Sequence, residues 1–125
     1  AYCFAEKTGY SKFGSYTGNG STDGTFVYTG FKPAWLMIKL SSAANENWAV
    51  YDNKRNTFNT TTSQRIRAND TQADTTSNSE IDLLSNGFKV HDNDAEINGS
   101  GNTYIYMAFA EAPLVGSNNV PCTAR

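Results

Sequence analysis

The chain has 125 residues, a length that fits one domain with a hydrophobic core of useful size. Aromatic residues make up 13% of it, ten residues are glycine and only 18% are charged, a composition that favours strands and an all-β fold. The net charge of −2 comes with no basic patch, and no run approaches the roughly 18–20 apolar residues of a membrane span, so we expect neither nucleic-acid binding nor membrane insertion.

The two ends of the chain share a short motif. Residues 1–6 read Ala-Tyr-Cys-Phe-Ala-Glu and residues 106–111 read Tyr-Met-Ala-Phe-Ala-Glu, with the phenylalanines 109 − 4 = 105 positions apart. Both copies lie in apolar, β-prone runs. We interpret the chain as one unit of a tandem array, in which residues 1–6 are the closing strand of a preceding copy.

The first half of the domain is predicted to alternate short strands with tight turns. Glycine-rich dipeptides between residues 17 and 24 favour turns, and short strands are expected between them. Residues 25–28 and 34–40 are predicted strands, and residues 48–51 are the natural antiparallel partner of the second. Apolar residues occur on both faces of 34–40, which predicts a central strand covered at least in part on both sides, with Leu36, Ile38 and Leu40 on one face and Trp35, Met37 and Lys39 on the other.

The second half contains a long polar excursion between two strand-rich regions. Residues 52–80 are rich in Asn and Thr and are expected to form one or two short strands around 65–67 and a surface loop. A hairpin is predicted at 81–91 and a last strand at 103–110. The sandwich domain would then span 7–113, followed by an extended arm at 114–125.

Three segments resemble a known family. Residues 18–35, 83–89 and 104–111 are similar to a module of tail-fibre and other virion surface proteins of tailed phages and prophages. That module is a concanavalin A-like, SPRY-type β-sandwich that often occurs in tandem copies. The resemblance implies an antiparallel β-sandwich of jelly-roll type, a virion surface location, other virion proteins as partners and a homotrimer, but no particular ligand.

The acidic and histidine residues do not form a convincing catalytic or metal-binding pattern. Hydrolysis would need two converging carboxylates, for which Glu80 with Asp82 and the 92–96 stretch are the nearest candidates, and His91 is the one histidine. Alternate oxygen ligands at Asp92 and Asp94 suit Ca²⁺, but tight turns use the same residues. We expect no enzyme activity, no cofactor and no metal.

The best candidate ligand site combines aromatic and planar polar side chains near the start of the polar excursion. Sugars are recognised by an aromatic face together with amide, carboxylate and guanidinium hydrogen bonds. Trp35 and Trp48 are expected to be core residues more than platforms. The predicted glycan-binding residues are Tyr51, Asp52, Asn53, Arg55, Phe58 and Arg65.

Two functions from different classes follow. The first is a virion surface domain that binds a host cell-surface glycan through residues 51–67. The second is a structural module that pairs with copies of itself, in which residues 115–125 connect it to its neighbour. A third hypothesis is a glycan depolymerase. Cys3 and Cys122 either form a disulfide that closes nearly the whole chain, or remain a small buried hydrophobe and a free thiol in a loose tail.

Overall fold

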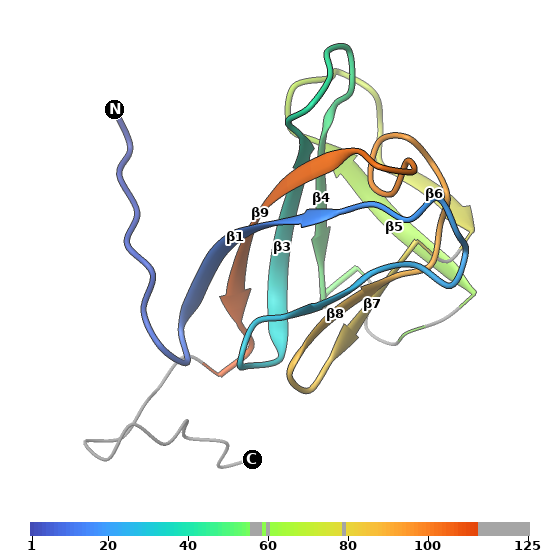
Figure 1. Cartoon of the computed structure of the whole chain (residues 1–125). Helices are drawn as coiled ribbons and strands as arrows, with labels where there is room; N and C mark the ends of the chain where they lie inside the picture. The colour runs from blue at the N-terminus through green and yellow to red at the C-terminus, as the bar shows by residue number, and fades with distance from the viewer. Residues whose placement is uncertain (56–58, 60, 79, 113–125) are drawn as a thin grey trace.

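The computed structural model describes residues 1–55, 59, 61–78 and 80–112. These residues form two antiparallel sheets, with strand orders β1-β9-β3-β4-β5-β6 and β2-β8-β7 (Figure 1). The predicted all-β antiparallel sandwich is confirmed. The strands are β1 (Ser11–Thr17), β2 (Phe26–Tyr28), β3 (Pro33–Leu40), β4 (Trp48–Asp52), β5 (Thr62–Arg67), β6 (Thr75–Asn78), β7 (Ile81–Leu84), β8 (Gly87–Val90) and β9 (Thr103–Ala110).

Strict alternation of side chains gives the six-stranded sheet an inner face. Leu36 and Ile38 on β3 are fully buried, and so are Tyr104 and Ala108 on the neighbouring strand β9. Residues i and i+2 of a strand point to the same side, so every second residue of these strands faces the small sheet. The predicted division of β3 into two faces is confirmed.

The small sheet covers this inner face with its own apolar side chains. Val27 of β2 is paired with Phe88 of β8, which is fully buried and lies edge-on to the rings of Tyr16 and Tyr106, with centroids 6.0 and 5.4 Å away. The buried set that joins the sheets comprises Tyr16, Val27, Phe31, Leu36, Ile38, Leu40, Ala49, Tyr51, Ile81, Leu83, Phe88, Val90, Ile97, Tyr104, Tyr106 and Ala108. A core of this kind makes the sandwich a rigid support for whatever its surfaces display.

Strand β1 is longer than the glycine-rich sequence around it suggests. It pairs with β9 along its whole length, from Ser11 opposite Phe109 to Thr17 opposite Thr103. Gly14 faces the ring of Tyr106, and a Cβ built there would lie 2.9 Å from the Tyr106 hydroxyl. The glycine is thus needed for close approach to an aromatic side chain and not for a turn.

Asn98 joins the loops at one end of the sandwich. It is fully buried, and its side-chain nitrogen donates to Asn19 Oδ1, to the Ser21 carbonyl and to the Asp92 carbonyl at 2.8–2.9 Å. Its side-chain oxygen accepts the Asn19 backbone N–H at 3.0 Å. One side chain therefore fixes the 18–24 turn against the loop that leads into β9.

The predicted polar excursion includes a strand that links the two sheets. β5 pairs with β4 only at its end, and Ser63 near its start accepts the backbone N–H groups of Glu80 and Ile81 at 2.9 and 3.4 Å. Of the one or two short strands expected around 65–67, β5 is confirmed, and its partner β6 lies further along the chain at Thr75–Asn78. Among the residues that the structure describes, there is no helix of the length and apolarity needed to cross a lipid bilayer.

Residues 1–6 form no strand, contrary to the β-strand that their sequence suggests. They continue beyond the turn closed by Lys7 and Ser11 without pairing with a strand, and the Phe4 ring lies 6.2 Å from Phe13 of β1 (Figure 1). Tyr2 is 96% exposed, so an apolar sequence alone does not give this segment a place in the sheet. Its origin in a preceding copy stays a prediction.

Candidate interaction surface

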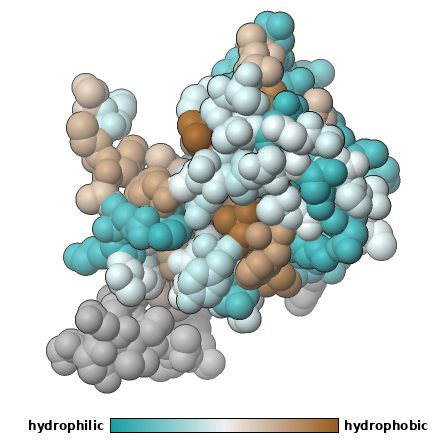
Figure 2. Space-filling model, viewed as in Figure 1, coloured by the Kyte–Doolittle hydropathy of each residue, from teal (hydrophilic) through white to brown (hydrophobic). Residues whose placement is uncertain are grey.

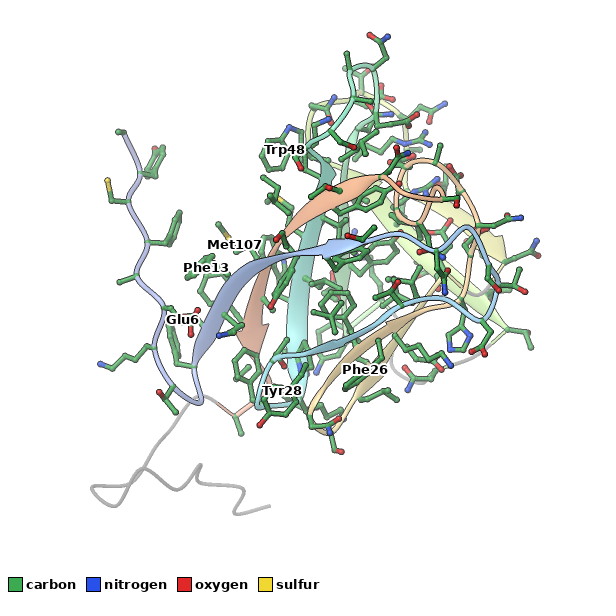
Figure 3. The ribbon with its side chains drawn as sticks, viewed as in Figure 1. Glu6, Phe13, Phe26, Tyr28, Trp48 and Met107 are labelled. Atoms are coloured by element: carbon green, nitrogen blue, oxygen red, sulfur yellow. The ribbon has the colours of Figure 1, made fainter. Side chains whose placement is uncertain are left out.

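The six-stranded sheet has a second face, which the small sheet does not cover. We call it the outer face; Figure 3 shows its residues Phe13, Met107 and Trp48 on the side of the sheet that is turned towards the N-terminal segment. Backbone register arranges its side chains in three rows across the strands. The rows are Ser11, Phe109, Trp35 and Asp52; then Phe13, Met107, Met37, Val50 and Ile66; then Ser15, Ile105, Lys39 and Trp48.

The middle row is apolar across five adjacent strands. Its members come from β1, β9, β3, β4 and β5 and are neighbours through the register of these strands. Ile66 remains 37% exposed, and in the next row Ile105 is 43% and Trp48 is 38% exposed. Scattered exposed apolar residues are normal on proteins, but a contiguous set of this kind marks an interaction surface.

One corner of the outer face is an aromatic cluster around Phe109. The Phe109 ring lies 5.7 Å from Trp35, 5.8 Å from Tyr10, 6.1 Å from Phe13 and 6.3 Å from Phe4, measured between centroids. Phe4 is itself 60% exposed, and hydrophobic residues run along the N-terminal segment in Figure 2. The segment therefore covers this corner only in part.

Charged side chains occur at two positions of the three rows. Asp52 ends the first row and is held by Arg55, whose Nε donates to its carboxylate at 2.7 Å. Partial burial favours a higher pKa for Asp52, but the hydrogen bonds from Arg55 and Lys54 outweigh it and hold the pKa below its ordinary value. Lys39 lies in the third row and donates to the Glu46 carbonyl at 2.8 Å.

Two of the predicted glycan-binding residues lie in the interior, which corrects their assignment. Tyr51 is 1% exposed and Arg65 is 6% exposed, because both occupy inward positions of β4 and β5. Neither side chain can contact a sugar at the surface. Trp48, expected in the core, lies instead on the outer face, since its side chain alternates with those of Ala49 and Tyr51.

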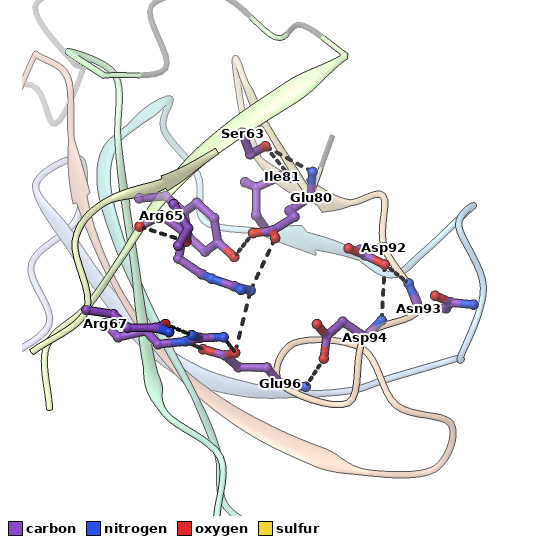
Figure 4. Close-up of polar contacts among 12 residues, drawn as sticks. Ser63, Arg65, Arg67, Glu80, Ile81, Asp92, Asn93, Asp94 and Glu96 are labelled. Atoms are coloured by element: carbon purple, nitrogen blue, oxygen red, sulfur yellow. Dashed lines mark hydrogen bonds and ion pairs between the residues drawn. The ribbon is translucent and has the colours of Figure 1, made fainter. Parts of the chain in front are cut away.

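Tyr51 and Arg65 belong to a buried polar network between the sheets (Figure 4). The Tyr51 hydroxyl donates to Glu80 Oε2 at 2.6 Å, and Arg65 Nη1 lies 3.2 Å from Glu80 and 3.6 Å from Glu96. Arg67 adds an ion pair with Glu96 at 2.8 Å. Two arginines and two glutamates balance in charge, so the network neutralises itself without a ligand.

Burial and charge shift the titration of this network. Burial raises the pKa of Tyr51, and the nearby Glu80 carboxylate raises it further. Burial alone would lower the pKa of Arg65, but Tyr51, Glu80 and Glu96 raise it above its ordinary value. Tyr51 is therefore a hydrogen-bond donor and Arg65 a cation at neutral pH.

The acidic residues considered for catalysis or metal binding have other partners. Glu80 and Glu96 converge on Arg65, but their side chains are only 1% and 3% exposed, too little to reach a bound substrate. Asp92 and Asp94 accept backbone N–H groups of their own turn. Within the described part of the chain, no group of three or more His, Cys, Asp or Glu side chains is placed to hold a metal ion.

The remaining predicted site residues gather beside the first row of the outer face. Asn53 donates from its side chain to Glu111 at 3.0 Å, and Glu111 forms an ion pair with Lys32 at 2.9 Å. Asp52 is the register partner of Trp35, which is half-buried on the same face. Phe58 lies outside the described residues. The predicted Cys3–Cys122 pairing also stays a prediction, because Cys122 is outside them; Cys3 is exposed and not a buried hydrophobe.

A family model relates the chain to known proteins. The model of a domain of unknown function, DUF7483, matches residues 1–113. The chain belongs to the DUF7483 family. We found no significant match among curated proteins or among solved structures. The DUF7483 match includes residues 1–6 along with the sandwich, so the family is defined over the N-terminal segment too.

The sequence indicated the second face of β3, with Trp35, Met37 and Lys39, but not that it belongs to an interaction surface across five strands. Residues 34–40 and 103–110 are apolar at nearly every position, which is more than one buried face requires. A strand of this kind needs a cover on both sides. The structure provides one cover, the small sheet; on the other side Val50 is only 7% exposed, whereas Ile66, Trp48 and Ile105 are 37%, 38% and 43% exposed.

Proposed function

We propose that this domain is a non-catalytic packing module of a virion surface assembly, and that it joins this assembly through the outer face of its six-stranded sheet. The observation that carries the proposal is the apolar middle row, from Phe13 on β1 to Ile66 on β5. The virion location rests on the resemblance of residues 18–35, 83–89 and 104–111 to tail-fibre modules.

A rigid sheet can bury an apolar face by packing it against another protein. Removing apolar surface from water is favourable by about 25 cal/mol per Å², and a sheet held by strand pairing presents that surface with little loss of conformational freedom on contact. The strands β9, β3 and β4 lie between other strands of the sheet and use their backbone groups in sheet pairing, so docking against this face leaves those groups satisfied. Packing against another protein therefore suits this face better than recognition of a small polar ligand.

Methionine oxidation tests the proposal, because the two methionines of the chain are Met37 and Met107, register partners in the middle row. In the isolated chain at low concentration, we expect hydrogen peroxide to convert both to sulfoxides, read by mass spectrometry. In the virion surface assembly, we expect both to react about tenfold more slowly, since docking excludes the oxidant. Equal oxidation rates in the two states would show that the outer face is not a packing surface.

A second candidate function, glycan binding, is favoured by one specific arrangement. Trp35 presents a half-buried aromatic ring in the first row beside Asp52, and Asn53 and Arg55 follow in the adjoining turn. An aromatic ring flanked by carboxylate, amide and guanidinium groups is a common setting for a pyranose. The candidate subsite keeps three of the predicted residues and replaces Tyr51 by Trp35 as the platform.

Substitution of Asn53 tests this second function. Asn53→Ala is expected to weaken binding to any glycan that the wild-type chain retains by about tenfold, because it removes an amide donor next to the platform. Binding is measured on a glycan array and then by calorimetry. Lys54→Ala, in the same turn with an exposed side chain, is the matched control and should bind as the wild type does. A wild-type chain that retains no glycan, or an Asn53→Ala variant with unchanged affinity, would contradict the candidate.

A further inference from the structure

The geometry points to a second copy of this chain as the occupant of the outer face, stacked across a two-fold axis that runs along the middle row, at right angles to the strands. This inference rests on the proposed function and names the partner of the same surface. Its basis is the position of the few charged side chains within the three rows.

Two sheets that pack face to face lie about 10 Å apart with strand directions within about 30° of each other. A symmetric pair of this kind has its two-fold axis in the plane between the sheets, and the same patch is used by both copies. The axis can run along the strands or along the rows. These two arrangements bring different residues into contact.

An axis along the strands is unfavourable. Among the five strands that form the outer face, β3 is central, with β1 and β9 on one side and β4 and β5 on the other. An axis along β3 would place each residue of this strand against its own copy. Lys39 would then meet the second copy's Lys39 amid apolar side chains, and two facing ammonium groups repel each other strongly there.

An axis along the rows is favourable. It exchanges the first and third rows, so Lys39 of one copy lies over Trp35 of the other, where an ammonium group is attracted to the face of an indole ring. Asp52 then lies opposite the second copy's Trp48, which is the register partner of Lys39. The lone cation thus approaches an aromatic ring and a carboxylate.

The middle row meets itself in this arrangement. Met37 lies against the second copy's Met37 and Met107 against its Met107, so the apolar row is covered except near Phe13, where the Phe4 ring of the same chain already lies 6.2 Å away. Methionine side chains are flexible enough to fill the irregular gaps of such a contact. The threefold assembly that the resemblance implies would need a different surface, since a threefold contact joins two unlike patches.

Analytical ultracentrifugation of the whole chain across a range of concentrations tests the inference. The wild-type chain is expected to pass from monomer to dimer, with Met37 and Met107 becoming protected from peroxide over the same range. Lys39→Ala is expected to weaken the dimer about tenfold, because both copies lose a cation–aromatic contact. The control Lys89→Ala, on β8 of the small sheet, should leave the dimer unchanged.

Lys39→Ala also separates the two axes by the sign of its effect. A tighter dimer would mean that the variant had relieved a Lys39–Lys39 repulsion, and this would overturn the axis along the rows. Ile66→Lys together with Ile105→Lys should abolish the dimer, because the contact would then have to bury added charges. The monomer should still fold, since both side chains are exposed in it. A persistent dimer in this double variant, or a trimer mass for the wild type, would likewise overturn the inference.

Methionine protection in the two states distinguishes loss of the second copy from loss of the packing function. If the isolated chain stays monomeric with reactive methionines, but the methionines are protected in the virion surface assembly, the second copy is excluded as the partner and the packing module stands. Methionines that react freely in both states would remove both proposals.

Discussion

Replacing Glu80 by alanine is expected to lower the free energy of unfolding by about 3–5 kcal/mol. The Glu80 side chain is 1% exposed, accepts the Tyr51 hydroxyl at 2.6 Å and lies 3.2 Å from Arg65. Without it, the Arg65 guanidinium loses a buried counter-charge and the Tyr51 hydroxyl loses its acceptor. Arg65 keeps Glu96 at 3.6 Å, but Glu96 also pairs with Arg67, so two cations would share one buried carboxylate, and this imbalance makes the expected loss large.

Urea unfolding followed by tryptophan fluorescence measures this loss. The matched control is Glu6→Ala, which removes a glutamate that pairs with Lys12 at the exposed edge of β1. Its transition midpoint should stay close to that of the wild type, because surface ion pairs are screened by water. If Glu80→Ala shifts the midpoint no further than Glu6→Ala does, the buried network is not a stabilising link between the sheets.

Replacing Phe88 by alanine is expected to cost a similar amount, about 3–5 kcal/mol, for a different reason. Phe88 is fully buried on β8 and contacts the rings of Tyr16 and Tyr106 across the sandwich. Its removal leaves a cavity between two sheets whose backbones are fixed by strand pairing. The surrounding side chains can therefore close the space only in part.

The control for Phe88→Ala is chosen from the same small sheet. Phe26 on β2 is paired with Lys89 and is 45% exposed, so Phe26→Ala removes the same side chain from the opposite face. We expect it to cost less than about 1 kcal/mol in the same urea titration. Equal losses for the two variants would mean that the small sheet does not bury Phe88 as described.

Most strands of the fold could be predicted from the sequence because their side chains alternate. The predicted strands at 34–40 and 103–110 correspond to β3 and β9, with inward and outward residues as expected. The whole of β1 was harder to predict, since Gly14 reads as a turn signal when its neighbour Tyr106 is unknown. A glycine can be required for a turn conformation or for close contact with another group, and the sequence alone does not say which.

The candidate site was less predictable than the fold. The sequence alone made Tyr51, Arg55 and Arg65 equivalent candidates for binding a glycan, because each side chain ends in a polar group and all three lie near one loop. Register separates them: Tyr51 faces the small sheet opposite Leu36, whereas Asp52 and the following turn lie at the outer edge. A shift of one residue along a strand reverses the face, so the surface site depends on pairing that the sequence does not state.

The sequence by itself determined the fold class, the position of most strands and the excess of apolar residues in β3 and β9, because side-chain alternation is a local property of an extended chain. The tertiary structure alone decided which apolar face was buried and which stayed open, and it brought Glu80 and Glu96 together on Arg65. These outcomes depend on contacts between residues far apart in the chain, and such contacts exist only once the two sheets have packed against each other.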